Sequence, residues 1–206
     1  MLCAILSDTV LFKSPTTTDA DRKAAEELAE IAGVSDIMAL GMDMFRAKSD
    51  LNDSADNIFH RDYKEFEING RKVGIGQLEL MDAAMIDPIK DDLFRAARRL
   101  LENGDCHTVL FLATDIMKQG SQMLVISRDL SVTENAFSVT LEPYKLTKLR
   151  NPAPAYAREG DTDYHHHTPS TGTPWADRLA ERWMPDMMSR KKQVLPFLMD
   201  AFNALD

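Results

Sequence analysis

Cysteine is scarce in this sequence. Only two of its 206 residues are cysteines, Cys3 and Cys106. Two cysteines separated by about a hundred positions form neither a disulfide framework nor the close pairs of a zinc site. We therefore expect a protein of a reducing compartment, the cytoplasm.

Long apolar runs and an excess of positive charge are also missing. No stretch approaches the ~18 consecutive apolar residues of a membrane helix, and the chain turns polar after Leu6, too early for a signal peptide. The formal net charge is -9, which argues against general nucleic-acid binding. We expect no membrane or nucleic-acid partner, so a small anion would need a local cluster of cations to attract it.

The composition that is present suits one soluble domain, either alone or with a helical appendage. Apolar residues make up 44% of the chain and charged residues 28%, both ordinary for a globular protein. Apolar periodicity and capping residues predict helices over residues 18–33, 36–47 and 88–103, with loop-like residues at 48–61. Alternation around Asn69-Gly70 predicts a hairpin. Further strands are expected at 108–113, 121–127 and 136–141, and a short helix at 175–183.

These elements predict an α/β fold. We expect a mixed β-sheet of about four or five strands, flanked by helices and preceded by a helical N-terminal junction segment. Residues 142–187 are rich in turn formers and lack a clear period, so we interpret them as an insertion.

A short basic motif is the strongest functional signal. Residues 189–193 read SRKKQ and stand directly before an apolar stretch that predicts a helix start. Backbone N–H groups and the helix dipole favour anions at such a position. Arg190 adds a planar fork for phosphate oxygens, and Lys191 adds a point charge. Basic runs are more often solvated surface, so this motif needs support from elsewhere in the chain.

Asp8 provides a second signal near the N-terminus. It follows an apolar run and precedes Thr9. A carboxylate at the end of a buried element is costly unless it is paired or holds a metal. Aspartate in a Ser-Asp-Thr sequence also commonly caps a helix or stabilises a turn, and both interpretations remain open at this point.

Three ordered segments together resemble the family II, manganese-dependent inorganic pyrophosphatases, a branch of the DHH phosphoesterases. Residues 4–18 read AILSDTVLFKSPTTT, and residues 189–196 read SRKKQVLP. The corresponding family patterns are close to AILSDTLLFKSPT-T and SRKKQVVP. Between them, residues 62–77 (DYKEFEINGRKVGIGQ) resemble the family's lysine-bearing strand and hairpin.

The resemblance implies a domain organisation. Whole family members carry His-x-x-x-Asp-x-Asp and Asp-His-His motifs in a preceding metal-binding domain, and this sequence contains neither. The chain resembles the C-terminal DHH-associated domain. We expect residues 1–55 to form the junction with the end of a DHH domain, and residues 56–206 to form the substrate-binding domain.

The resemblance also implies site residues. Lys64, Arg190 and Lys191 match the family's substrate cations and would hold pyrophosphate or another small phosphorylated anion. Asp8 matches a metal ligand, for manganese or magnesium. No residue is assigned to catalysis with certainty, and the remaining metal ligands would come from a DHH domain in a longer chain or a separate chain. We therefore expect a pyrophosphatase part that is inactive alone.

Other interpretations stay open. A non-catalytic phosphate- or polyphosphate-binding module would use the same cations, and so would an exopolyphosphatase-like phosphoesterase. Asp161, Asp163 and His165–His167 contain metal-ligand residue types, although a polar loop is the simpler interpretation. Asp115, after the central strand, is interpreted as a turn residue.

Overall fold

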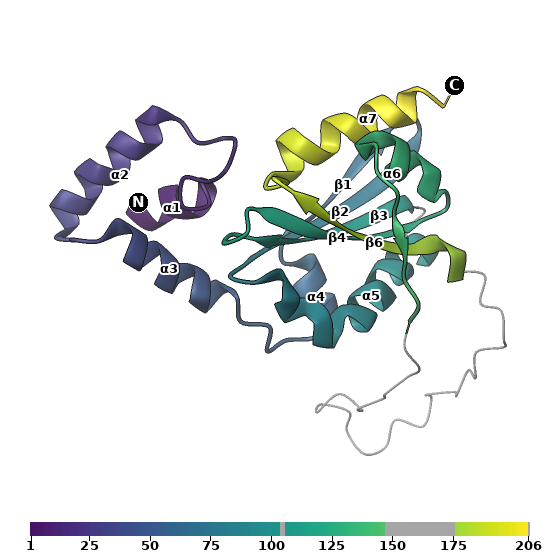
Figure 1. Cartoon of the computed structure of the whole chain (residues 1–206), viewed down its shortest axis with the longest axis horizontal. Helices are drawn as coiled ribbons and strands as arrows, with labels where there is room; N and C mark the ends of the chain where they lie inside the picture. Colours follow the sequence, from purple (N-terminus) through teal and green to yellow (C-terminus); the bar gives the residue numbers. More distant parts are fainter. Residues whose placement is uncertain (104–105, 147–175, 206) are drawn as a thin grey trace, which may run out of the picture.

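The fold was analysed in a computed structural model that describes residues 1–103, 106–146 and 176–205. The chain begins with three helices that form a group of their own beside a larger α/β body (Figure 1). They are α1 (Leu2–Asp8), α2 (Asp19–Ala32) and α3 (Ile37–Lys48).

The capping residues explain where two of these helices start and stop. Thr18 and Asp21 form a capping box at the start of α2, and Gly33 ends the helix with a left-handed φ of 68°. Asp36 caps α3 through the backbone N–H of Ala39. Both predicted helices are confirmed.

The larger body is built on one mixed sheet of six strands in the order β1-β2-β3-β4-β6-β5. The β2–β3 pair is parallel, and the other pairs are antiparallel. Asn69 and Gly70 turn the β1–β2 hairpin with φ values of 48° and 68°, as predicted. The strands are β1 (Tyr63–Ile68), β2 (Arg71–Leu80), β3 (Cys106–Asp115), β4 (Gly120–Ser127), β5 (Glu142–Pro143) and β6 (Leu179–Pro185).

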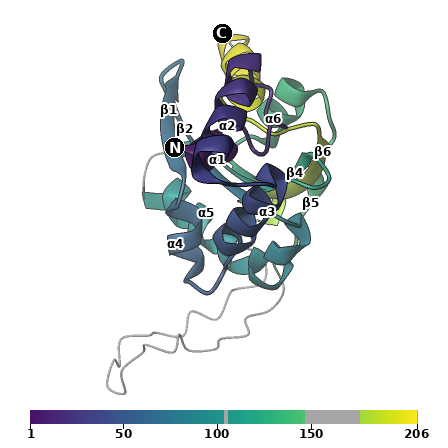
Figure 2. The ribbon, with the colours of Figure 1, turned by 90° about the vertical axis from the view of Figure 1, so that its left-hand side faces the viewer.

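Helices cover both faces of this sheet. On one face lie α4 (Ala55–His60) and α5 (Lys90–Asn103), which follows the 3-10 helix η1 (Ala83–Ile89). On the other lie α6 (Leu130–Phe137) and α7 (Leu195–Asn203), with the π-helical turn η3 (Arg190–Val194) leading into α7 (Figures 1 and 2). The α/β class is therefore confirmed, with one strand more than expected.

Several local predictions were wrong. Residues 48–61 contain α4, which Ser54 caps. The strand expected at 136–141 does not form: its first two residues end α6, which spans residues 130–137, and residues 138–141 are turn and irregular structure. Most of the helix predicted at 175–183 is instead the 3-10 turn η2 (Ala176–Arg178) followed by β6. Helix α5 starts two residues after Pro88, because η1 holds that proline.

The tract interpreted as an insertion includes part of the sheet. Strand β6 pairs with β4 over seven residues, from Gly120 opposite Pro185 to Ile126 opposite Leu179. Residues 147–175, including His165–His167, lie outside the described residues. The boundaries of the insertion stay a prediction. None of the described helices combines the length and apolar character needed to cross a membrane.

The segment after α1 has an unusual backbone. Val10, Leu11 and Phe12 have φ values of 48°, 53° and 62°, a left-handed conformation that costs L-residues roughly 1–2 kcal/mol each. Burial offsets this cost, because Val10 and Leu11 are only 4% and 2% exposed. Leu11 and Leu6 both lie next to Gly41 on α3, within one buried cluster. The three helices thus hold the predicted junction segment in a strained but buried conformation.

We predict that Gly41→Ala destabilises the chain by about 1–3 kcal/mol, as overpacking does. A Cβ there would lie 2.0 Å from Cδ2 of Leu11. The cost of relieving this overlap in a buried cluster outweighs the ~1 kcal/mol that alanine gains over glycine within a helix. Urea unfolding followed by circular dichroism measures the change. In a Leu11→Ala background the same substitution should cost less. Equal or greater stability of the single variant would contradict this account of the junction.

Candidate functional site

The basic motif forms a structured turn before α7. Ser189 caps η3, and Gln193 folds back onto the preceding turn. The Gln193 side-chain oxygen accepts from the backbone N–H groups of Met188 (2.8 Å) and Ser189 (3.0 Å), and its amide donates to the Asp186 carbonyl (2.7 Å). The serine and glutamine of SRKKQ therefore shape the backbone that presents the cations between them.

A buried polar network fixes this turn to the sheet. Gln77, on β2, is 8% exposed. Its amide nitrogen donates to the Thr114 hydroxyl (3.1 Å) and the Met188 carbonyl (3.2 Å), and its oxygen accepts from the Arg190 backbone N–H (3.2 Å). Thr114 shares a hydrogen bond with Ser121, which donates to the Met187 carbonyl (2.6 Å). Buried polar groups satisfied in this way hold a single geometry.

Arg190 points inward, toward the start of β1. Its side chain is 9% exposed and forms an ion pair with Asp62 at 2.9 Å. The guanidinium also donates to the backbone carbonyls of Asp62 (2.7 Å) and Ile75 (3.1 Å). A buried cation needs such partners. The predicted substrate arginine is therefore already anchored to protein groups through part of its guanidinium.

Lys64 lies on the sheet face that η3 and α7 cover. It is paired in register with Ile75, whose carbonyl accepts from Arg190. Its neighbour Tyr63 points to the opposite face and contacts Phe59, with ring centroids 5.7 Å apart. Successive strand residues alternate between faces, so Lys64 faces the Arg190 side. Burial raises the pKa of the Tyr63 hydroxyl, which keeps it protonated.

Lys64 and Lys191 differ from Arg190 in being solvent-exposed. Neither lysine has a hydrogen bond or ion pair within the described part of the chain. Two ammonium groups without internal counter-ions are available to an anion. The structure thus connects Lys64 to Arg190 through Ile75, and Lys191 follows Arg190 in the chain. Arg190 is buried and paired, whereas the two lysines are exposed.

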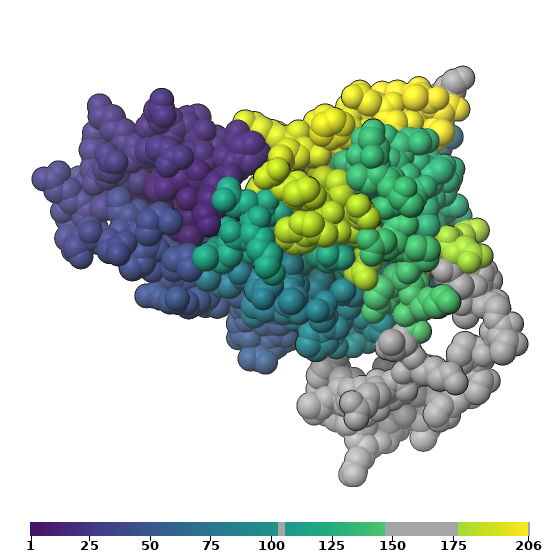
Figure 3. All heavy atoms as spheres, viewed as in Figure 1, coloured from purple at the N-terminus to yellow at the C-terminus, as the bar shows by residue number. Residues whose placement is uncertain are grey.

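Lys192 connects the basic motif to the N-terminal segment. Its ammonium group donates to the Pro15 carbonyl at 3.0 Å. Lys13 makes a parallel link from the other direction by donating to the Ile116 carbonyl, beyond the end of β3, at 2.7 Å. Met188 packs into the core of the three N-terminal helices. The two sequence motifs, far apart in the chain, therefore meet in space (Figure 3).

Asp8 lies at the C-terminal end of α1 with an exposed side chain. The next residue, Thr9, accepts through its backbone carbonyl from Ser14 (2.9 Å) and Thr17 (3.4 Å), which brings Asp8 close to the Pro15 segment. An exposed carboxylate is a suitable oxygen ligand for manganese or magnesium. Within the described residues, no three His, Cys, Asp or Glu side chains form a metal-binding group.

Asp115 is the last residue of β3, and its carboxylate stabilises the turn that follows, a structural role like the one predicted. It is fully buried, and its carboxylate accepts from the backbone N–H groups of Ala83 (3.1 Å), Met117 (2.9 Å) and Lys118 (2.7 Å). Its oxygens are therefore used by the fold. Asp161, Asp163 and His165–His167 lie outside the described residues.

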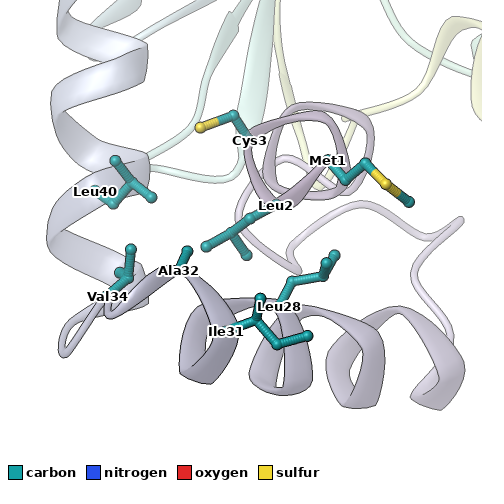
Figure 4. A pocket seen from close by; sticks show the side chains of 8 residues that line it. All are labelled: Met1, Leu2, Cys3, Leu28, Ile31, Ala32, Val34 and Leu40. Carbon is teal, nitrogen blue, oxygen red and sulfur yellow. The ribbon is translucent and has the colours of Figure 1, made fainter.

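An apolar pocket of about 330 Å³ lies among the N-terminal helices. Figure 4 shows that Leu2, Leu28 and Ile31 project toward it from α1 and α2. No charged side chain lines it, so it does not suit a phosphorylated anion. It is separate from the cation-bearing turn.

Asp62 and Gln77 contribute to the site, but the sequence analysis did not name either of them as a site residue. Both lie at the ends of the segment that resembles the family, but only Lys64 was selected within it. Gln77 carries a usable signal, because it is a polar residue inside the apolar run of β2, and buried polar groups must find partners. Asp62 carries no such signal, because an exposed aspartate before a strand is commonplace.

We predict that Gln77→Leu lowers the free energy of unfolding by about 2–3 kcal/mol, since it leaves buried partners on β3 and in the 188–190 turn unpaired. Gln122→Leu is the matched control. Gln122 is partly buried and makes one side-chain bond, to Glu181 at 2.9 Å, so its loss should cost less than about 1 kcal/mol. Urea denaturation of both variants measures the difference, and equal costs would show that the network does not hold the turn.

Comparison with known proteins supports the resemblance seen in the sequence. The family model described as the DHHA2 domain matches residues 42–201. The manganese-dependent inorganic pyrophosphatase of Methanocaldococcus jannaschii is 37% identical over 204 residues, a match that covers 98% of this chain and 54% of the relative. The probable manganese-dependent inorganic pyrophosphatase of Archaeoglobus fulgidus is 36% identical over 206 residues, with coverages of 100% and 53%.

A solved structure agrees with these matches. A crystal structure described as a family II inorganic pyrophosphatase of Methanococcus jannaschii superposes with a TM-score of 0.73 at 37% identity, and covers 98% of this chain and 54% of that one. The chain spans about half the length of the curated relatives it matches. It belongs to the DHHA2 domain family and is a relative of the family II inorganic pyrophosphatases.

Proposed function

We propose that this chain is the substrate-binding part of a manganese-dependent inorganic pyrophosphatase, which hydrolyses pyrophosphate to two phosphates. The observation that carries the proposal is the grouping of cations at the start of β1 and at η3. Lys64 is paired in register with Ile75, whose carbonyl accepts a hydrogen bond from the Arg190 guanidinium, and Lys191 follows Arg190 in the chain. An exposed lysine on the sheet face that η3 covers, a fixed guanidinium and a second exposed lysine next to it in the chain suit a doubly phosphorylated anion.

The cations would act by positioning and by charge neutralisation. Phosphoryl transfer asks little covalent chemistry of the protein, so orientation of the phosphates and stabilisation of developing charge dominate. Lys64, Arg190 and Lys191 would hold the terminal phosphate oxygens and stabilise the charge that develops on the leaving phosphate. The Gln77 network keeps the backbone of η3 in place while this happens.

Asp8 would be one ligand of the metal site. With the metal bound, the site would supply a water of lowered pKa as the nucleophile. One carboxylate cannot hold a two-metal cluster, so the other ligands would come from a DHH domain, either in a longer chain or in a separate one. The contacts of Lys13 and Lys192 keep the Asp8 segment against the substrate cations.

We predict that the 206-residue chain alone hydrolyses pyrophosphate poorly or not at all. Phosphate release with manganese, and separately with magnesium, measures this against a metal-free blank. Robust metal-dependent turnover would refute the assignment of the chain as a part that needs further ligands.

We predict that Lys64→Ala and Lys191→Ala each weaken binding of inorganic pyrophosphate by about fivefold to tenfold, the effect of one charge-assisted hydrogen bond. Arg190→Lys should also weaken it, because the planar fork is lost. Lys23→Ala removes the same charge from an exposed position on α2 and should change nothing. Calorimetric titration at constant ionic strength gives the affinities.

The same titration separates the competing functions. Tighter binding of pyrophosphate than of tripolyphosphate or longer chains supports the pyrophosphatase proposal. Tighter binding of long polyphosphate would instead favour an exopolyphosphatase-like enzyme or a polyphosphate-binding module. Equal effects of the Lys23 and Lys191 substitutions would show that binding is a general charge effect and would count against the proposed site.

A further inference from the structure

The side chain of Asp62 contacts the candidate site without being one of its cations. Asp62 stands immediately before β1, two residues from Lys64, and its carboxylate is 46% exposed while its partner Arg190 is 9% exposed. Both its backbone carbonyl and its carboxylate accept hydrogen bonds from the same guanidinium. Asp62 therefore holds one end of Arg190 in two places.

The hydrogen bonds of Arg190 show which part of the guanidinium remains available. Guanidinium carries five N–H donors in a plane. Nη1 donates to the carbonyls of Asp62 and Ile75, and Nη2 donates once to the Asp62 carboxylate. Within the described residues this leaves the Nε–H group and one of the two Nη2–H groups. Because one residue, Asp62, accepts from both Nη1 and Nη2, its two acceptors are placed along the Nη1–Nη2 edge. The Nε–H group and the Nη2–H group beside it then form a parallel fork on the other edge.

We propose that Asp62 is the positioning residue that turns Arg190 into a fixed, one-sided fork for a phosphoryl group. The proposal rests on the proposed function and assigns a role within the same site. By occupying the Nη1–Nη2 end of the guanidinium, Asp62 leaves the Nε–Nη2 edge as the one that can bind two phosphate oxygens. The exposed ammonium groups of Lys64 and Lys191 then supply the remaining charge.

The charge balance of the Asp62–Arg190 pair supports a positioning role. The alternative is that the Asp62 carboxylate competes with the phosphate for Arg190. A buried guanidinium without a counter-ion is unfavourable, so Asp62 keeps Arg190 ordered when no ligand is bound. An ordered side chain loses less rotamer freedom when the phosphate arrives. The carboxylate engages a different edge from the one that the ligand would use, so the anion need not displace it.

The test compares Asp62→Ala with Asp62→Asn in the full chain, with inorganic pyrophosphate as the probe. The asparagine side chain keeps an oxygen acceptor for Nη2, whereas alanine removes it. We expect Asp62→Ala to weaken binding about tenfold and Asp62→Asn to stay within about threefold of the unaltered chain. Asp56→Ala, which breaks the exposed pair of Asp56 with Arg99 on α4 and α5, is the matched control and should leave affinity unchanged.

A spectroscopic readout separates positioning from a loss of stability. The Nε–H signal of Arg190, assigned by its disappearance in Arg190→Lys, should shift on adding pyrophosphate to the unaltered chain and to Asp62→Asn. It should not shift in Asp62→Ala, although the unfolding temperature of that variant stays close to that of the Asp56→Ala control.

The outcomes distinguish this inference from the proposed function. If Arg190→Lys and Lys191→Ala weaken binding but Asp62→Ala binds pyrophosphate as tightly as the unaltered chain, or more tightly, the positioning role is overturned and the proposed site stands. If the unaltered chain shows no saturable binding, or if Arg190→Lys has no effect, both are overturned.

Discussion

The structure around the candidate site depends on a positive charge that lies inside the protein. Arg190 is buried against β1 and β2, where bulk water cannot solvate its guanidinium. The fold meets this requirement with the Asp62 carboxylate and the carbonyls of Asp62 and Ile75, while Gln77 fixes the Arg190 backbone. Because these partners come from the sheet, the position of the basic turn is set by the rigid part of the molecule.

This arrangement divides neighbouring cations into different roles. Arg190 is held within the fold, Lys191 is exposed, and Lys192 is bound to the N-terminal segment through Pro15. The π-helical turn produces this division, because it directs three consecutive side chains to three surroundings. A run of basic residues that looks uniform in sequence therefore contributes a buried, anchored guanidinium, an exposed charge and a structural link.

Much of the fold could be predicted from local signals. Thr18 with Asp21, Asp36, and Asn69 with Gly70 act within a few residues, and the elements they define are correct. One error falls where tertiary contacts decide, because residues 179–185 form β6 by pairing with β4. Helices α4 and α6 have local caps, Ser54 and Asp129, which the sequence analysis did not use. Composition in those stretches is compatible with more than one element.

The candidate site shows the same division between residue identity and orientation. The motifs indicated Lys64, Arg190, Lys191 and Asp8 by resemblance, and Asp115 was correctly interpreted as structural. The sequence could not indicate that Arg190 turns inward or that Asp62 meets it, because those contacts join residues 128 positions apart. Long-range hydrogen bonds of this kind follow from the assembled sheet and not from local pattern.

The lysine contacts at Pro15 and Ile116 have a mechanical consequence. Two lysine hydrogen bonds connect the strained segment after α1 to the sheet body: Lys13 donates from that segment to Ile116, and Lys192 donates back to Pro15. Met188 packs among the N-terminal helices. A shift of those helices would therefore displace the turn that carries Arg190 and Lys191, because close-packed interiors transmit strain. Displacement at the segment that carries Asp8 would therefore be felt at the cations of η3, and the reverse.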